Sequence, residues 1–123
     1  MNLIMITKKE MVSVVLAEFV QDIVRKNGLD FAVDFMEHYT STVDRLYFGW
    51  ENAEMFTGAN DVLSALGVAG FSTHSNYTNF VDGLIDNYIT QHPNSAVSLF
   101  QDGKHVGYGL HIVKKSYYSL DNT

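Results

Sequence analysis

The residues best suited to catalysis stand together in the segment Ser72–Ser75. It holds two serines and a threonine beside His74, and a histidine within hydrogen-bond reach of a hydroxyl can act as its general base. The run from Gly70 to His74 partly matches the Gly-x-Ser-x-Gly nucleophile elbow, but its last position is histidine and no strand is predicted before it. An enzyme or small-ligand site at Ser72–Ser75 is therefore one hypothesis for function, and it ranks below the two hypotheses that are given at the end of this subsection.

Two further pairs of ionisable residues lie four positions apart, which places each pair on one face of a helix. Asp34 and His38 form the first pair, in which the carboxylate could orient the imidazole as a base. Asp82 and Asp86 form the second, which could hold a divalent cation or act as an acid and a base. Both spacings are more typical of solvated helix surfaces, and we favour that interpretation.

Histidine and cysteine, the residues that often hold transition metals, give no pattern typical of a metal site. The two histidines expected on one strand face, His105 and His111, are six residues apart, or about 20 Å along a strand. The chain contains no cysteine, which excludes disulfides, thiolate catalysis and cysteine-ligated metals. We therefore expect no metal, no cofactor and no catalytic residue.

Charge is strongly segregated along the chain. Residues 29–94 contain nine acidic residues against Arg45 alone, a balance of −8, whereas residues 1–28 and 95–123 each carry +1. Such a field favours a basic partner and argues against direct binding of nucleic acid, which requires clustered Lys and Arg. No apolar run approaches the ~20 residues that cross a membrane. We expect a cytoplasmic protein with no membrane contact.

The acidic stretch also contains the residues that we expect to bind a protein partner. Aromatic and methionine side chains, which are enriched in binding hot spots, cluster around Trp50 within an expected loop over residues 49–58. These side chains could instead fill the core beneath that loop. The candidate partner-binding residues are Asp34, Glu37, Asp44, Trp50, Glu51 and Glu54. In this hypothesis Trp50 anchors the partner and the carboxylates form an acidic rim.

Four helices are predicted to position these residues. Thr7 and Glu10 have the spacing of a capping box, and apolar positions on more than one side of a helix follow it as far as Gly28. Two further helices are expected at residues 30–47 and 60–66. The last helix is expected to start near Ser75 or Tyr77 and to continue to about Gln91, and Pro93 ends it.

The C-terminal part of the chain predicts an antiparallel hairpin. Strands at residues 95–101 and 104–114 flank Asp102-Gly103, a dipeptide typical of a two-residue type I′ turn. A lone hairpin is marginally stable, so it must pack on the helices or gain a further strand. Residues 2–6 could supply that third strand.

The two-residue turn also predicts the register of the hairpin. It pairs Leu99 with Val106 and Val97 with Tyr108, and these four side chains would form the core face. The opposite face carries glycines, which leave a shallow strip where a second subunit could approach closely. The candidate self-association residues are Gly107, Gly109 and His111.

These patterns predict one compact α+β domain over residues 1–123, with about four helices before a C-terminal hairpin and a frayed tail at residues 117–123. The first functional hypothesis is a non-catalytic module that inhibits a basic, nucleic-acid-handling host protein by occluding its surface. The small size, the lack of cysteine and the many Asn and Tyr residues suit an accessory protein of a phage or mobile element. The second hypothesis is a self-assembling homo-oligomer joined through the hairpin.

Overall fold

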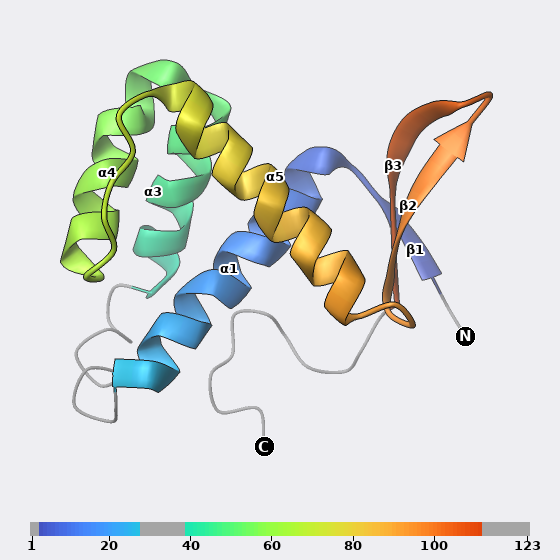
Figure 1. The fold of residues 1–123 in the computed structure, drawn as a ribbon, viewed down its shortest axis with the longest axis horizontal. Helices are drawn as coiled ribbons and strands as arrows, with labels where there is room; N and C mark the ends of the chain where they lie inside the picture. Colours follow the sequence, from blue (N-terminus) through green and yellow to red (C-terminus); the bar gives the residue numbers. More distant parts are fainter. Residues whose placement is uncertain (1–2, 28–38, 112–123) are drawn as a thin grey trace.

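The computed structural model describes residues 3–27 and 39–111 and has an α+β fold (Figure 1). The elements in chain order are β1 (Leu3–Ile6), α1 (Lys8–Asn27), α3 (Tyr39–Glu51), the short 3₁₀ helix η1 (Ala53–Met55), α4 (Phe56–Ala65), α5 (His74–Gln91), β2 (Ala96–Gln101) and β3 (Lys104–His111). The helices pack together, and the three strands form a sheet at one end of them (Figure 1). The expected fold class is confirmed, and the N-terminal segment supplies the third strand.

Helix α1 starts with the expected capping box and forms the centre of the core. The backbone N–H of Thr7 donates to Oε1 of Glu10 at 3.0 Å, and the N–H of Glu10 donates to Oγ1 of Thr7 at 3.2 Å. The helix crosses α5 (Figure 1) and also contacts α3 and β3. Its buried apolar residues, which lie on more than one side as expected, are Met11, Val12, Val15, Leu16, Ala17, Val20 and Val24.

The helix expected at residues 30–47 is described only from Tyr39, because residues 28–38 lie outside the described ranges. Helix α3 runs on to Glu51, and α4 begins at Phe56 rather than near residue 60. The loop expected at residues 49–58 is therefore mostly helical, and that prediction is wrong.

The reason for the helical path is a cap that the sequence analysis missed. Asn52 has an extended backbone, and its side-chain oxygen accepts from the N–H of Glu54 at 2.9 Å, which starts η1. Gly49 then lets α3 and α4 pack closely, because a Cβ at this position would overlap the Cβ of Ala59. The chain thus turns sharply between two helices instead of forming a long loop.

Helix α5 closely follows its prediction. Thr73 caps it by accepting from the N–H of Asn76 at 3.1 Å, and the helix ends at Gln91 as expected. Tyr77 is fully buried, and its hydroxyl donates to the carbonyl oxygen of Leu46 in α3 at 2.7 Å. Burial raises the pKa of Tyr77 far above its usual value. This hydrogen bond fixes α5 on α3 inside the core.

The sheet is antiparallel with the strand order β1-β3-β2, so β3 is its central strand. Asp102 and Gly103 have φ values of 53° and 78°, which confirms the type I′ turn. The first two pairs beyond the turn, Gln101 with Lys104 and Phe100 with His105, follow the register that this turn predicts.

Beyond these pairs the predicted register is wrong, because a β-bulge shifts it by one residue between Leu99 and Phe100. Leu99 pairs with Gly107 and Val97 with Gly109. Tyr108 stays in the core, whereas Val97 is 40% exposed and Val106 is 49% exposed. The prediction assumes that the two strands pair without a bulge. Two of the four expected core residues, Val97 and Val106, are therefore exposed to solvent.

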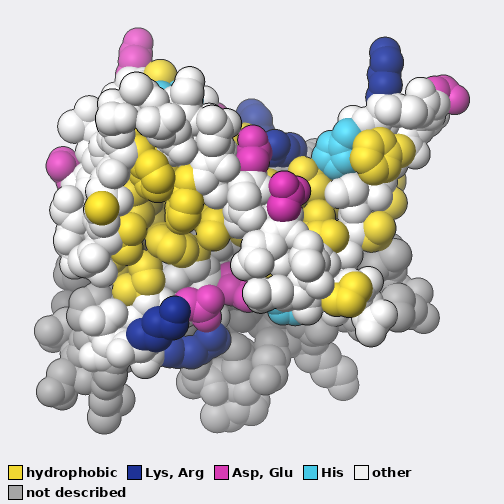
Figure 2. All heavy atoms as spheres, viewed as in Figure 1, with side chains coloured by type: hydrophobic (Ala, Val, Ile, Leu, Met, Phe, Trp, Pro, Cys, Tyr) yellow, Lys and Arg dark blue, Asp and Glu magenta, His cyan; other side chains and the backbone are white. Residues whose placement is uncertain are grey.

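The hairpin projects away from the helices (Figure 1). Ala96 at the base of β2 is 3% exposed, whereas Phe100 near the turn is 65% exposed. Along the hairpin the His105 ring lies 4.5 Å from the Tyr108 ring and 5.4 Å from the Phe100 ring. Figure 2 shows a histidine and hydrophobic side chains together on the projecting part. The hairpin therefore offers apolar surface to solvent.

Candidate functional site

An open groove lies where the first turn of α1 meets the end of α3 and the middle of α5. Its volume is about 430 Å³, and its walls are formed by Lys8, Lys9, Trp50, Glu51, Thr78 and Asp82. Four of these six side chains are charged, two of each sign, and the indole of Trp50 adds a flat apolar surface. Because it combines these groups in one concavity, this groove is the candidate site.

Two ion pairs hold the charged side chains of the groove. Nζ of Lys8 lies 2.7 Å from Oδ1 of Asp82 in α5, and Nζ of Lys9 lies 2.9 Å from Oε2 of Glu51 in α3. Partial burial lowers the pKa of Lys8, but its hydrogen bond to Asp82 and the charge of Asp82 outweigh burial, so this pKa is raised. Both pairs are largely solvated, so they add little to stability and can open.

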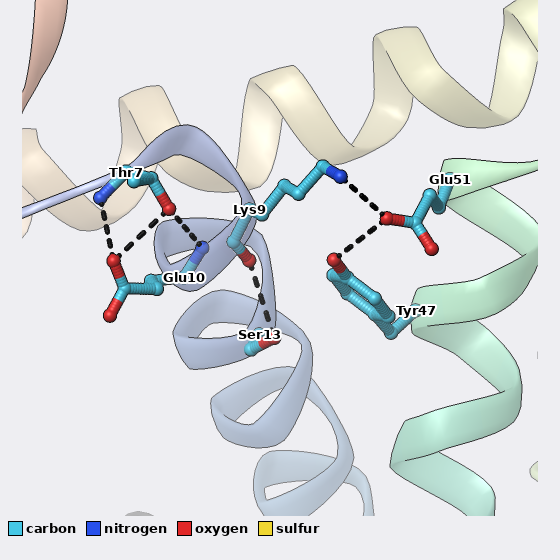
Figure 3. Close-up of polar contacts among 6 residues, drawn as sticks. All are labelled: Thr7, Lys9, Glu10, Ser13, Tyr47 and Glu51. Carbon is cyan, nitrogen blue, oxygen red and sulfur yellow. Dashed lines mark hydrogen bonds and ion pairs between the residues drawn. The ribbon is translucent and has the colours of Figure 1, made fainter.

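Glu51 has a second partner in the groove wall. Its Oε2 also accepts from the hydroxyl of Tyr47 at 3.2 Å, so the carboxylate is held between two donors (Figure 3). The hydrogen bond from Lys9 lowers the pKa of Glu51. Figure 3 also shows that Lys9 reaches across to α3 while the neighbouring Glu10 turns back to Thr7. The capping box therefore orients the first turn of α1 so that Lys9 faces α3.

Trp50 is half-buried and is held from two sides. Its ring lies 5.8 Å from the ring of Tyr47, and its backbone carbonyl oxygen lies 3.0 Å from Nε2 of His74. A carbonyl oxygen only accepts, so Nε2 of His74 carries the proton in this contact. The indole lines the groove together with the side chains of Glu51 and Asp82.

The expected partner-binding residues fall into three groups. Trp50 and Glu51 line the groove, whereas Asp44 on α3 and Glu54 on η1 are exposed outside it. Asp34 and Glu37 lie outside the described residues. The carboxylates of the predicted acidic rim therefore do not lie together in one site. Glu51 is paired with Lys9 of the same chain.

The structure adds residues that the sequence analysis did not connect with Trp50. Asp82 was expected on a solvated face or at a cation site, but it lies in the groove with Lys8. Thr78 stands one turn before Asp82 on α5 and lines the same groove. Lys8 and Asp82 are 74 residues apart in the chain, so periodicity could not bring them together. Only the capping box at Thr7 hinted at where the lysines would stand.

The aromatic and methionine cluster around Trp50 divides between core and surface. Trp50 and Phe56 pack against the core, whereas Phe48 and Met55 are about half exposed. The sequence leaves open whether this cluster fills the core or forms a binding surface. Part of the cluster packs against the core, and part of it is exposed to solvent. Of the exposed members, Met55 directly follows Glu54 in sequence, and Phe48 lies four residues after Asp44.

A second apolar area lies on the helical part of the molecule, where Figure 2 shows hydrophobic side chains gathered over the helices. Half-buried Phe80 of α5 packs edge-on against Phe19 of α1 at 5.4 Å and lies tilted against Phe71, in the linker between α4 and α5, at 5.0 Å between ring centroids. The linker is held by Asn60, whose side chain exchanges two hydrogen bonds with the backbone of Phe71. These contacts hold α1, α5 and the linker together.

The segment Ser72–Ser75 forms the start of α5. Thr73 is the cap, and the hydroxyl of Ser72 accepts from the side chain of Asn76 at 2.9 Å. His74 binds the carbonyl of Trp50, and its ring lies 5.8 Å from the ring of Phe56. These side chains have structural contacts, and a catalytic role for them stays a prediction.

Metal ligands do not gather in the part of the chain that the structure describes, where no three His, Asp or Glu side chains form a group that could hold a metal ion. Asp82 is bound by Lys8 at 2.7 Å, and Asp86 is exposed beside it on α5. The pair Asp34 and His38 lies outside the described residues.

The candidate self-association residues lie on the central strand β3, which is paired on both sides within the chain. A Cβ on Gly107 would come 2.8 Å from the carbonyl oxygen of Ile6 in β1, so this glycine serves a close approach inside the sheet. Gly109 is buried, and His111 pairs with Leu3 in the register of β1 and β3. Self-association through these three residues stays a prediction.

Comparison of the chain with models of protein families, with curated proteins and with solved structures gives no match. Among the described helices, none combines the length and the apolar character that a membrane span requires. The site therefore has to be interpreted from its own geometry.

Proposed function

We propose that this protein is a non-catalytic module that binds the basic surface of a protein partner through the groove around Trp50. The observation that carries the proposal is the position of the indole, which lies in one groove with the carboxylates of Glu51 and Asp82. An aromatic ring beside two carboxylates is a favourable environment for a cation. Arginine is the partner side chain that fits this environment best.

Arginine fits better than lysine for a geometric reason. The guanidinium is planar, stacks on aromatic rings and donates two parallel hydrogen bonds to a carboxylate, whereas an ammonium is a compact and more strongly hydrated charge. In the groove a guanidinium could lie on Trp50 and donate to Glu51 or Asp82, with the hydroxyl of Thr78 as a further acceptor. The protein's own Lys8 and Lys9 hold these carboxylates when no partner is bound.

The wider charge distribution supports the same partner. Residues 29–94 carry a balance of −8, and Asp44, Glu54 and Asp61 are exposed on the described helices outside the groove. Such a field accelerates the approach of a basic protein and makes binding weaker as salt rises. A partner that uses its basic surface for nucleic acid would lose access to it when bound. This occlusion would make the module an inhibitor, a role that suits a phage or mobile-element accessory protein acting inside a host cell.

The alternative of an enzyme at Ser72–Ser75 has less support. The side chains of this segment already have structural contacts: Thr73 and Ser72 bind Asn76 at the start of α5, and His74 binds the carbonyl of Trp50. The groove itself is lined by lysines and carboxylates together with Trp50 and Thr78.

A fluorescence titration tests the proposal. Trp50 is the only tryptophan in the chain, so its emission reports directly on the groove. The probes are short oligoarginine, oligolysine and oligoglutamate peptides of equal length, each titrated at low and at physiological salt. We expect oligoarginine to change the emission saturably and to bind at least about threefold more tightly than oligolysine, with weaker binding at higher salt. Equal affinity for the two basic peptides, or no change with either, would contradict the proposal.

A further inference from the structure

Strand β2 forms one outer edge of the sheet. The order β1-β3-β2 leaves β1 and β2 each with one side that no other strand covers among the residues that the structure describes. The backbone N–H and C=O groups along such an edge can pair with another strand. The edge of β1 is only four residues long, whereas β2 has six residues and belongs to the projecting hairpin.

Strand β2 lacks the features that usually keep an edge from pairing. Its sequence, Ala-Val-Ser-Leu-Phe-Gln from Ala96 to Gln101, has no charged residue and no proline. The extra residue of the bulge belongs to β3, so the backbone of β2 itself stays regular. Val97 and Phe100 expose 40% and 65% of their surface. Within the part of the chain that the structure describes, this edge is therefore both unprotected and apolar.

We propose that two copies of this chain pair through their β2 edges, antiparallel across a two-fold axis, and so form one continuous six-stranded sheet. A strand that meets its own copy in this way is self-complementary, and each residue that contacts the partner is contacted in return. The occupant of the edge is thus a second copy of β2. This inference is independent of the groove around Trp50.

The apolar side chains select one register of this pairing. Residues directly opposite each other across an antiparallel pair share a face of the sheet. When Ser98 faces Ser98 of the second copy, Val97 faces Leu99 and Phe100 faces Ala96, so each exposed apolar side chain of β2 meets an apolar one. The next allowed register, centred on Leu99, sets Phe100 against Ser98 and Val97 against Gln101. The register centred on Ser98 is therefore favoured.

The position of the hairpin leaves room for the second copy. The hairpin projects from the helices (Figure 1). Ala96 at its base is buried, whereas Phe100 near its turn is 65% exposed. The strongly acidic stretch lies before residue 95, so β2 carries no like charges that would repel a second copy. The outer edge of β2 is not paired with any described strand.

Solution mass with two lysine variants tests the pairing. We expect the wild-type chain to approach twice its mass of 13.8 kDa in sedimentation equilibrium as concentration rises. Val97→Lys places a charge on the pairing edge and is expected to give a folded monomer. Met5→Lys introduces the same charge at an exposed position on β1 and is expected to leave the dimer intact. Circular dichroism confirms that both variants fold. A wild type that stays monomeric, or a dimer that persists in Val97→Lys, would overturn the proposal.

A cross-linking experiment tests the register independently of affinity. The chain has no cysteine, so one introduced cysteine can form a disulfide only with its copy. Ser98→Cys is expected to cross-link under mild oxidation, because the two positions face each other. In Phe100→Cys the two sulfurs would be four residues out of register, about 13 Å apart, and are expected to remain reduced. Cross-linking of Phe100→Cys but not of Ser98→Cys would overturn the proposed register.

Discussion

Lys9, the second residue of α1, donates to Glu51, the last residue of α3, across 2.9 Å. The sequence predicts Glu51 as a member of an acidic rim, and in the structure the chain itself supplies a cation for this carboxylate. The Lys9 side chain is 64% exposed, so this ion pair is solvated and can open. A basic partner would therefore have to displace Lys9 before it could bind the carboxylate of Glu51.

Removal of this competitor should strengthen binding. Lys9→Ala frees Glu51 for a partner cation, and we expect oligoarginine to bind about 2- to 5-fold more tightly than to the wild type. Lys26→Ala removes the same charge from the other end of α1 and separates the local effect from net charge. The measurement is the Trp50 fluorescence titration. An equal gain in both variants would show that Lys9 has no special competing role.

The same pair should control the titration of Glu51. The hydrogen bond from Lys9 holds the pKa of Glu51 below 4.5. A carboxyl whose folded pKa is depressed contributes stability above its unfolded pKa and loses it as pH falls through the folded pKa. We expect the Glu51 pKa, measured by NMR of the carboxyl carbon, to rise toward 4.5 in Lys9→Ala. An unchanged value would show that the ion pair is absent in solution.

Tyr77 should contribute to stability through its hydroxyl. Tyr77→Phe removes the 2.7 Å hydrogen bond to the carbonyl of Leu46, and we expect a loss of about 1 kcal/mol at neutral pH by denaturant unfolding. Burial raises the pKa of Tyr77, so the wild type loses stability as pH rises above the unfolded value of about 10. The difference in unfolding free energy between the wild type and Tyr77→Phe should therefore become smaller at alkaline pH. A gap that stays constant up to alkaline pH would contradict the burial of a neutral hydroxyl.

Two helical glycines should respond oppositely to alanine. Gly49→Ala places a Cβ against Ala59, and we expect it to destabilise the fold by about 1–3 kcal/mol. Gly83 on α5 has open space around it, so Gly83→Ala should stabilise by about 0.5–1 kcal/mol through helix propensity. Thermal unfolding of the two variants checks both signs. Equal effects would contradict the close packing of α3 on α4.

The features that the sequence predicted well are those set by neighbouring residues. The capping box of Thr7 and Glu10 and the type I′ turn at Asp102-Gly103 depend on short spacings, and the structure confirms both. The cap of η1 at Asn52 is also a local feature. The sequence prediction misses this cap because Phe48-Gly49-Trp50 is interpreted as the start of a loop.

The features that it missed depend on contacts between distant residues. The bulge shifts β3 against β2 where Gly107 meets the backbone of Ile6, a contact that no periodicity of the hairpin encodes. The groove likewise joins Lys8 to Asp82 and Lys9 to Glu51 across three helices. Composition identified the acidic stretch, but only the fold shows which carboxylates stand beside Trp50.

The most direct test of the groove as a binding site compares two variants of equal net charge. Asp82→Asn removes a carboxylate from the groove, whereas Asp61→Asn removes an exposed one from α4. Each is titrated with oligoarginine while Trp50 emission is recorded at low and at physiological salt. We predict that Asp82→Asn weakens binding at least about fivefold and that Asp61→Asn changes it by less than about twofold. Equal affinities for the two variants would show that the acidic surface attracts cations without using the groove.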